Sequence, residues 1–559
     1  MKKGILKHIA LAIAIFIGVN ILSSYIYKRL DLTQDKRYTL SEEAKAIIDQ
    51  VDNPIVLDVY LEGSFPPEFR RLQAETEQLL EEFSAINPNI RYDFTDPMEV
   101  DNSQALLQEF SRRNMTGAQI QVREGGKVST ETVFPWALAQ YNGQTIKIPL
   151  LKNQLGATSE ERVNSSIQNL EYAFADGFKK LVTPKSKKIA ILKGNGELGD
   201  AQLADFLKTI GDYYHIAPFT LDSAEVSPKR TLDQLNTFDL IIVAQPMEPF
   251  SDNEKLILDQ YIMNGGASLW LIDATQLRRD PESGNTFGFG MDLNLNDFFF
   301  KYGLRVNPNL VKDIYSAPIV LASGEDREAQ YNQYPWFYYP LSSSGNNHPI
   351  VTNIEAVKFQ YASGIDILEN DIEKTVLLSS SPISQEVGLP AEINMDVEIP
   401  KNLKVVNEGP DMNVFNAGEI PLAVLLEGQF TSVFQNRIKP FSPSTLKETS
   451  PSTKMVVVSD GDVIANQLDR NRPLELGFDK WTGNFYGNKD FLLNTVNYLL
   501  DDSGLINIRS KEIAIPFLDP QKTANERGTW QLVNILLPLV LLGLFGIFFH
   551  FYRTRKYGR

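Results

Sequence analysis

The 559-residue sequence contains no cysteine and only four histidines. The absence of cysteine excludes thiolate catalysis, cysteine-ligated zinc, iron–sulfur clusters and a disulfide framework. The histidines are too far apart to predict a metal site or a catalytic triad; they are His8, His215, His348 and His550. The G-x-S-x-G motif of serine hydrolases is also missing. We therefore expect no catalytic residues and no metal centre built on these side chains.

Basic residues are fewer than acidic residues. The chain has 54 Lys and Arg against 70 Asp and Glu, which gives a formal net charge of −16. A general nucleic-acid-binding protein needs a basic face to neutralise phosphates, so this class is excluded. A hydrophobic fraction of 43% and a charged fraction of 22% are typical of a folded protein. At about 100–200 residues per domain, this length predicts three or four domains.

Long apolar runs are present near both ends of the chain. Residues 9–26 and 532–549 each form a run with few polar interruptions. With their flanks, both are long enough to cross a bilayer, since about 20 residues of helix span the hydrocarbon core. The sequence therefore predicts transmembrane helices at residues 9–27 and 530–551. A cleaved signal peptide is the alternative for the first run, but no small-residue cleavage site follows it.

The short tips beyond the two predicted spans are basic. Residues 1–8 carry three lysines and residues 552–559 carry three arginines and one lysine, with no acidic residue in either tip. The positive-inside rule places both tips in the cytoplasm. The chain between the spans then forms one large domain outside the inner face. Because two spans are too few to make a transport pathway, a transport role would need a partner membrane protein.

The region between the spans alternates strands and helices and predicts an α/β fold. Its expected parts are a first α/β domain (28–155), a linking helix (156–184), a second α/β domain (185–515) and a juxtamembrane linker (516–529). In the second domain, apolar strands at 188–192, 239–244, 267–272 and 454–459 predict a doubly wound parallel sheet. Residues 280–450 are rich in Pro, Gly, Ser and Asn, and we interpret them as insertions. Disorder is expected near 384–412 and 440–453.

The segment Gly194-Asn195-Gly196-Glu197-Leu198-Gly199 is a G-x-G-x-x-G motif between a predicted strand and a predicted helix. Asp222 lies near the end of the next strand, as in the dinucleotide-binding fingerprint. However, the carboxylate of Glu197 would repel a pyrophosphate at the helix N-terminus. We therefore favour a structural turn with Asp200 capping the helix, and keep dinucleotide binding by Gly194, Gly196, Gly199 and Asp222 as the weaker hypothesis.

Asp460 and Asp462 follow the end of another predicted strand, where ligands collect in open α/β sheets. Two close carboxylates are suited to Mg²⁺ or Ca²⁺. Asp-Gly is also a common turn, and Asp462 is placed to cap the helix that follows. The structural interpretation is favoured, so these residues remain weak candidates for a metal site.

The densest aromatic cluster is Trp336-Phe337-Tyr338-Tyr339, which stands between two prolines. If exposed, such residues form a recognition surface, because Trp and Tyr concentrate at binding hot spots. If buried, they would anchor an insertion to the core. The sequence leaves both open, and the four residues are candidates for an interaction site.

Seven stretches of the chain match one known family. They are RYTLSEEAKAII (37–48), VYLEGSFPPEFRRLQ (59–73), LKGNGEL (192–198), PWFYYPL (335–341), LAVLLEGQFTSVF (422–434), VVVSDGDVIANQ (456–467) and PLELGFDKWTGNFYGNKDFLLNTVNYLLDD (473–502). On these stretches the chain resembles the GldG-type auxiliary component of the gliding-motility ABC transporters of Bacteroidetes. The match covers essentially the whole chain, including both predicted spans.

The resemblance implies a permease partner of the GldF type, a cytoplasmic ATPase of the GldA type, and a role in gliding motility and associated secretion. It also implies an inner-membrane location with a periplasmic large domain. The second domain looks like the class I glutamine amidotransferase-like fold, whose activity needs a nucleophilic cysteine that this chain lacks. We therefore expect a non-enzymatic subunit without cofactors. The alternative is a stand-alone membrane-tethered protein that binds a solute or glycan.

Overall fold

A computed structural model of the chain describes residues 15–18, 39–63, 65–100, 103–124, 127–152, 154–323, 330–343, 345–443, 445–500, 504–510 and 520–558. The predicted membrane helix at residues 9–27 therefore lies outside the described residues, apart from a helical turn at 15–18. The chain divides into two compact units, Met1–Glu512 and Ile513–Arg559. Each unit is described separately below.

The first unit begins with a four-stranded sheet. In spatial order its strands are β2 (Ile90–Phe94), β1 (Ile55–Val59), β5 (Trp136–Tyr141) and β6 (Gln144–Pro149). Strands β1 and β2 are parallel, and α3 (Pro67–Ile86) lies between them in the chain. A short helix α4 (Ser103–Arg112) and the antiparallel hairpin β3 (Ala118–Glu124) and β4 (Lys127–Val133) precede β5. The α/β character predicted for residues 28–155 is therefore present.

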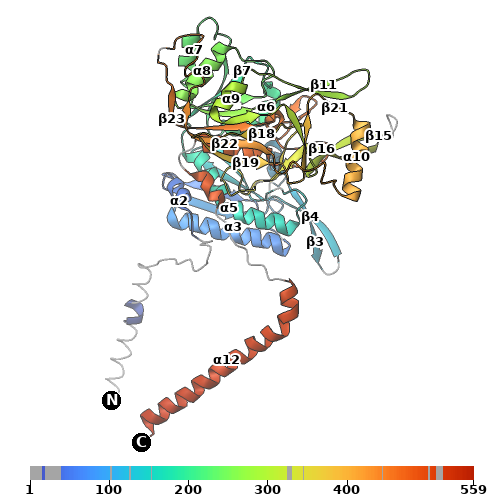
Figure 1. Ribbon diagram of the computed structural model, residues 1–559. Coiled ribbons are helices and arrows are strands. Elements are labelled where there is room, and N and C mark those ends of the chain that lie inside the picture. The colour runs from blue at the N-terminus through green and yellow to red at the C-terminus, as the bar shows by residue number, and fades with distance from the viewer. Residues whose placement is uncertain are drawn as a thin grey trace. The chain divides into compact units, whose positions relative to one another are not determined.

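Capping side chains set the start of two helices in this region. Ser41 accepts a hydrogen bond from the Ala44 amide and begins α2 (Glu42–Ile48). Thr158 and Glu161 form a reciprocal capping box that begins α5 (Ser159–Val182). The second helix is the predicted linker, but more than half of it is buried, and it runs beside α3 (Figure 1). It is therefore part of the hydrophobic core.

The main sheet of the first unit has seven strands. In spatial order they are β19 (Glu373–Ser379), β22 (Pro421–Thr431), β23 (Thr449–Val458), β10 (Ala267–Leu271), β9 (Leu240–Ala244), β7 (Lys188–Lys193) and β8 (His215–Thr220). The five strands from β23 to β8 are parallel, while β22 and β19 pair antiparallel at the β23 side. The prediction of a mostly parallel sheet is confirmed. Strands β19 and β22 come from the stretch interpreted as insertions and extend this sheet.

Helices cover both faces of the seven-stranded sheet, which explains the uninterrupted apolar sequence of its central strands. The helices are α6 (Asp200–Gly211) and α11 (Asn488–Leu500) on one face and α7 (Pro228–Leu235), α8 (Asp252–Met263) and α9 (Asn296–Tyr302) on the other. Alternate residues of each strand point to opposite faces. Ile242 of β9 belongs to the core cluster that contains Phe206 of α6, whereas the neighbouring Val243 belongs to the cluster that contains Leu256 of α8.

The other helices and strands of the first unit lie outside these two sheets. They are β11 (Thr275–Arg279), β12 (Thr286–Gly290), β13 (Leu304–Val306), β14 (Asn309–Asp313), β15 (Ser316–Ser323), β16 (Gln330–Ser342), β17 (Val357–Lys358), β18 (Ile365–Ile367), β20 (Ser384–Gly388), β21 (Ala391–Ile393), α10 (Met395–Glu408), η1 (Gly461–Ile464), β24 (Leu468–Asp469), β25 (Arg472–Pro473) and η2 (Leu505–Ser510). The disorder expected near 384–412 is wrong, because β20, β21 and α10 occupy most of it. Asn394 caps α10 by accepting a hydrogen bond from the Asp396 amide.

The second unit contains the helix α12 (Pro520–Tyr557). Residues 525–557 of this helix are apolar and long enough to cross a membrane, and their side chains are not buried in the protein. The span predicted at 530–551 lies within this helix. The described part of the chain offers one such helix.

Candidate functional site

Polar side chains gather where the parallel strands of the main sheet end. Gln245 follows β9, Asp273 lies two residues after β10, and Asp460 and Asp462 follow β23. The Gln245 amide donates to Asp273 Oδ2 at 2.8 Å, and Asp273 Oδ1 accepts from the backbone amide of Gly461 at 2.7 Å. We call Gln245, Asp273, Asp460 and Asp462 the carboxyl-edge cluster. The sequence predicted the last two as a pair, and the fold adds the other two.

The three carboxyl groups of this cluster hold protons more tightly than exposed aspartates do. Burial raises the pKa of Asp460 well above its usual range, and the charges of Asp462 and Asp273 raise it further. Burial also raises the pKa of Asp273. For Asp462, burial and the Asp273 charge raise the pKa to about 7. Because like charges repel in a buried site, part of the cluster stays protonated at neutral pH.

Backbone amides already use both oxygens of Asp460. Oδ1 accepts from the Asp462 amide at 2.8 Å, and Oδ2 accepts from the Gln360 amide. Asp460 is thereby the N-cap of η1, so the prediction that Asp462 caps this helix is wrong. Within the described ranges, no group of three or more His, Cys, Asp or Glu residues is arranged to hold a metal ion. This geometry supports a structural and proton-holding role for the pair.

The glycine-rich turn after β7 packs directly on the loop after β9. Gly194 and Gly196 have φ angles of +119° and +76°, which side chains other than glycine rarely adopt. A Cβ on Gly196 would lie 3.0 Å from Met247 Cβ, and one on Gly194 would lie 3.0 Å from Asp222 Oδ1. The Asn195 carbonyl accepts hydrogen bonds from the Met247 and Glu248 amides. Close packing therefore accounts for both glycines.

The carboxylate of Glu197 turns back onto this loop, where Oε2 accepts from the Asn195 amide at 2.8 Å. An acidic side chain thus takes an amide that a phosphate would need, which supports the structural interpretation of the motif. The prediction that Asp200 caps the following helix is wrong, however. Gly199 occupies the N-cap position of α6, and Asp200 is in the first turn, paired with Lys193 at 3.0 Å.

The aromatic cluster lies on β16, and most of it is inside the protein. Trp336, Phe337 and Tyr338 are at most 2% exposed, and Tyr339 is partly buried. Phe337 packs edge-on against Phe415. Trp336 and Tyr338 pack in one apolar cluster with Leu310, Ala391 and Ile393, so the anchoring interpretation holds for these rings. Trp336 and Tyr339 also line a cavity.

This cavity, which we call the aromatic cavity, has a volume of about 280 Å³. Its wall comes from β15, β16, the end of β17 and the chain after it, the start of α10 and the loops that follow η1. Gln360 belongs to this wall and donates its amide proton to Asp460, so the cavity lies beside the carboxyl-edge cluster. Ligands in open α/β folds bind at this edge of the sheet. The aromatic cavity is therefore the candidate functional site.

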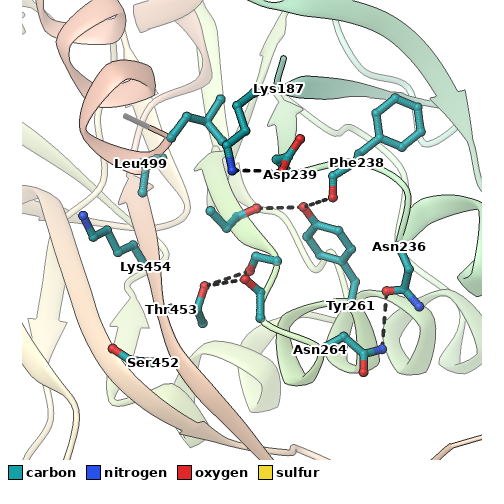
Figure 2. A pocket seen from close by; sticks show the side chains of 14 residues that line it. Lys187, Asn236, Phe238, Asp239, Tyr261, Asn264, Ser452, Thr453, Lys454 and Leu499 are labelled. Carbon is teal, nitrogen blue, oxygen red and sulfur yellow. Dashed lines mark hydrogen bonds and ion pairs between the residues drawn. The ribbon is translucent and has the colours of Figure 1, made fainter. Parts of the chain in front are cut away.

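A second cavity of about 340 Å³ lies at the opposite edge, where the strands begin (Figure 2). Its polar groups mostly bind one another. Lys187 pairs with Asp239 at 3.2 Å, and the Tyr261 and Thr453 hydroxyls each share their proton between two backbone carbonyl oxygens. Few of its donors and acceptors remain for a ligand, so this cavity is the weaker candidate.

Comparison with known proteins places the chain in a family. The pattern of a family described as an "ABC-type uncharacterized transport system" matches residues 186–495, which include the seven-stranded sheet and its insertions. The chain belongs to this family. It is accordingly an auxiliary component of an ABC-type transport system. A second pattern, for a domain of unknown function, matches residues 34–140.

The chain is distantly similar to an uncharacterized protein and to a solved domain. An uncharacterized protein of Borreliella burgdorferi is 21% identical over 544 residues, covering 96% of this chain and 95% of the relative. Among solved structures, the mmIFT52 N-terminal domain is 13% identical and covers 56% of this chain and 98% of its own, with a TM-score of 0.31. At that score the likeness carries no argument about this protein.

Sequence patterns did not predict Gln245 and Asp273 of the carboxyl-edge cluster, nor Lys358 and Asp479 of the aromatic cavity. Lys358 and Asp479 form an ion pair of 2.7 Å in the aromatic cavity, although 121 residues separate them in the chain. Asp273 follows a strand end just as Asp460 does, so position after a strand was the available signal for it. No motif in the neighbouring sequence indicates that Lys358 or Asp479 belongs to a site.

Proposed function

We propose that this auxiliary component is a non-enzymatic, membrane-anchored subunit that joins an ABC permease and its cytoplasmic ATPase through its transmembrane segments. The observation that carries the proposal is α12. Residues 525–557 have the length and apolarity of a membrane span, and none of that segment is packed inside the protein. An apolar helix without internal contacts is suited to lipid and to neighbouring helices.

The finer features of the proposal rest on the sequence resemblance. The partners are of the GldF permease and GldA ATPase types, and the system serves gliding motility and associated secretion. The other transmembrane helix comprises residues 9–27, and both termini are in the cytoplasm. The protein is in the cell inner membrane, with its large domain in the periplasm. The amidotransferase-like character of the second domain belongs to this proposal as well.

Features of the site support a non-catalytic role. The chain lacks the cysteine that an amidotransferase requires. The glycine-rich turn binds its own Glu197, and Asp460 binds backbone amides with both oxygens. These groups position the loops at the edge of the sheet, beside a cavity that is open to a ligand.

Co-purification from native membranes tests the proposal. A tagged full-length chain in mild detergent should bring down a multi-span permease and an ATPase. Asn534 is a polar residue in the apolar helix and is exposed, so its amide is suited to a hydrogen bond with a permease helix. The Asn534→Leu variant should recover about threefold less permease or less still. The control Leu541→Ile should recover the normal amount.

Recovery of the chain without any permease would contradict the proposal. That result would favour the alternative, a stand-alone membrane-tethered protein that binds a solute or glycan. The aromatic cavity is the observation that favours this alternative, because it fits a ligand whether or not a permease is present.

A further inference from the structure

The aromatic cavity combines flat apolar faces with polar groups on its wall. Tyr339, Tyr361 and Trp481 supply rings, and Gln360 and Gln467 supply amides. Ligand pockets have this character, with apolar surface for affinity and a few polar groups for orientation. Trp481 is 58% exposed although it lines the cavity, so it lies at the opening.

The ring of Tyr361 is held in place at a conformational cost. Its φ angle is +57°, which is an outlier for a bulky side chain. The Tyr361 amide donates to the Tyr338 carbonyl at 2.8 Å, and the Tyr361 ring packs edge-on against Tyr339 with centroids 5.3 Å apart. Strained residues of this kind persist where the surrounding structure fixes them, and they cluster at ligand sites.

The charges in the cavity balance one another. The Lys358 ammonium pairs with Asp479, and it also lies over the rings of Tyr339 and Tyr486 at 5.1 and 5.4 Å from their centroids. The ring faces of Tyr339 and Tyr486, which are suited to a cationic ligand, are therefore already occupied by the Lys358 ammonium. An anionic ligand is disfavoured because the only cation on the cavity wall is paired and the carboxyl-edge cluster lies next door.

Hydrogen-bonding groups of both kinds remain available. Gln467 Oε1 accepts from the Lys480 amide, and its NH₂ group has no partner within the described part of the chain. The Gln360 side chain likewise has none there, although its backbone is bonded to Asp460. Asp479 Oδ1 already accepts from the Trp481 and Thr482 amides, so the Lys358–Asp479 pair offers a ligand Asp479 Oδ2 and the remaining ammonium protons of Lys358. A ligand that both donates and accepts hydrogen bonds would satisfy these groups.

We propose that the aromatic cavity binds a neutral sugar ring, which packs against the part of the Trp481 ring that Tyr331 and Lys480 leave exposed. Its hydroxyls form hydrogen bonds with Gln360, Gln467 and the Lys358–Asp479 pair. A pyranose has an apolar C–H face that matches an aromatic ring. Its vicinal hydroxyls are donors and acceptors at once, which matches an ion pair. A volume of about 280 Å³ suits one ring rather than a long chain.

This inference goes beyond the proposed function, since assembly with a permease does not require the cavity. Either can fail without the other. A protein that co-purifies with a permease but binds no sugar keeps the proposed function and loses the inference.

The test is calorimetric titration of the full-length protein with D-glucose, D-mannose, D-galactose and N-acetyl-D-glucosamine. The detergent must carry no sugar headgroup, because alkyl glycosides would compete for the site. Glucuronate and glucosamine, titrated in parallel, report the preference for a neutral ring. Maltotriose and chitotriose distinguish a free sugar from the end of a glycan chain, since only a chain-end site binds the trisaccharides as well as the single rings.

We expect saturable binding of at least one neutral sugar and weaker binding of its charged analogue. Trp481→Ala and Gln360→Ala should each weaken it about tenfold. Both side chains are at least partly exposed, so the variants should fold. The control Tyr315→Ala removes an exposed ring outside the cavity and should bind normally. The absence of saturable binding to all neutral probes, or binding that both cavity variants leave unchanged, would overturn the inference.

Discussion

Replacing Asp462 with asparagine should stabilise the protein more at pH 8 than at pH 5. Burial and the Asp273 charge raise the pKa of Asp462 to about 7, while Gln245 and Lys358 partly offset this rise. In the unfolded chain, an aspartate titrates near its ordinary value of about 3.9. Between these two pKa values, the folded protein keeps a proton that the unfolded chain has released.

The sign and size of the effect follow from that proton. Stability falls as the pH rises wherever the folded state binds more protons than the unfolded state. A pKa shift of about three units amounts to about 4 kcal/mol, of which about 2–3 kcal/mol accrues between pH 5 and pH 7. Asparagine has no proton to lose and nearly the shape of the protonated acid. The gain from Asp462→Asn should therefore be about 2–3 kcal/mol larger at pH 8 than at pH 5.

Urea denaturation at the two pH values, followed by tryptophan fluorescence, measures this difference. Comparing the same variant at two pH values cancels any pH-independent change in packing or hydrogen bonding. The control Asp469→Asn alters an exposed carboxylate and should give the same small effect at both pH values. An Asp462→Asn effect that is equal at pH 5 and pH 8 would refute the account of the cluster.

Three further substitutions test the fold, each measured by the same urea denaturation. Asp259 is fully buried and accepts four hydrogen bonds, so Asp259→Ala should cost about 3–5 kcal/mol. Gly196→Ala should cost at least 1 kcal/mol more than Gly143→Ala, because both glycines have positive φ but only Gly196 faces a tight contact. Thr158→Ala removes a helix cap and should cost about 1 kcal/mol; a change below about 0.3 kcal/mol would show that the cap is not stabilising.

Local patterns in the sequence predicted much of the main sheet. The apolar runs at 239–244 and 267–272 became β9 and β10, because parallel strands covered on both faces have no polar side. The turn at Gly194–Gly199 could also be read from its glycines and from Glu197. The wrong predictions also came from local patterns in the sequence. Asp200 looked like a cap, but Gly199 holds that position.

Other features depend on contacts that no short window of sequence contains. The helix α10 contains Pro400 and a polar sequence, and its buried Glu398 pairs with Lys312, 86 residues away, a contact that no local pattern predicts. The aromatic cavity needs Lys358 and Asp479 brought together from distant loops. The carboxyl-edge cluster needs β10 and β23 to be neighbours, and their pairing across about 190 residues is a property of the fold.

The most direct test of the proposed function is the identity of the chain that lies against α12 in living cells. A photo-crosslinking amino acid at Leu541, which is 57% exposed in the apolar segment, would capture that neighbour for mass spectrometry. The account predicts a crosslinked product that contains an ABC permease subunit. A protein crosslinked only to lipid, or only to another copy of itself, would contradict it.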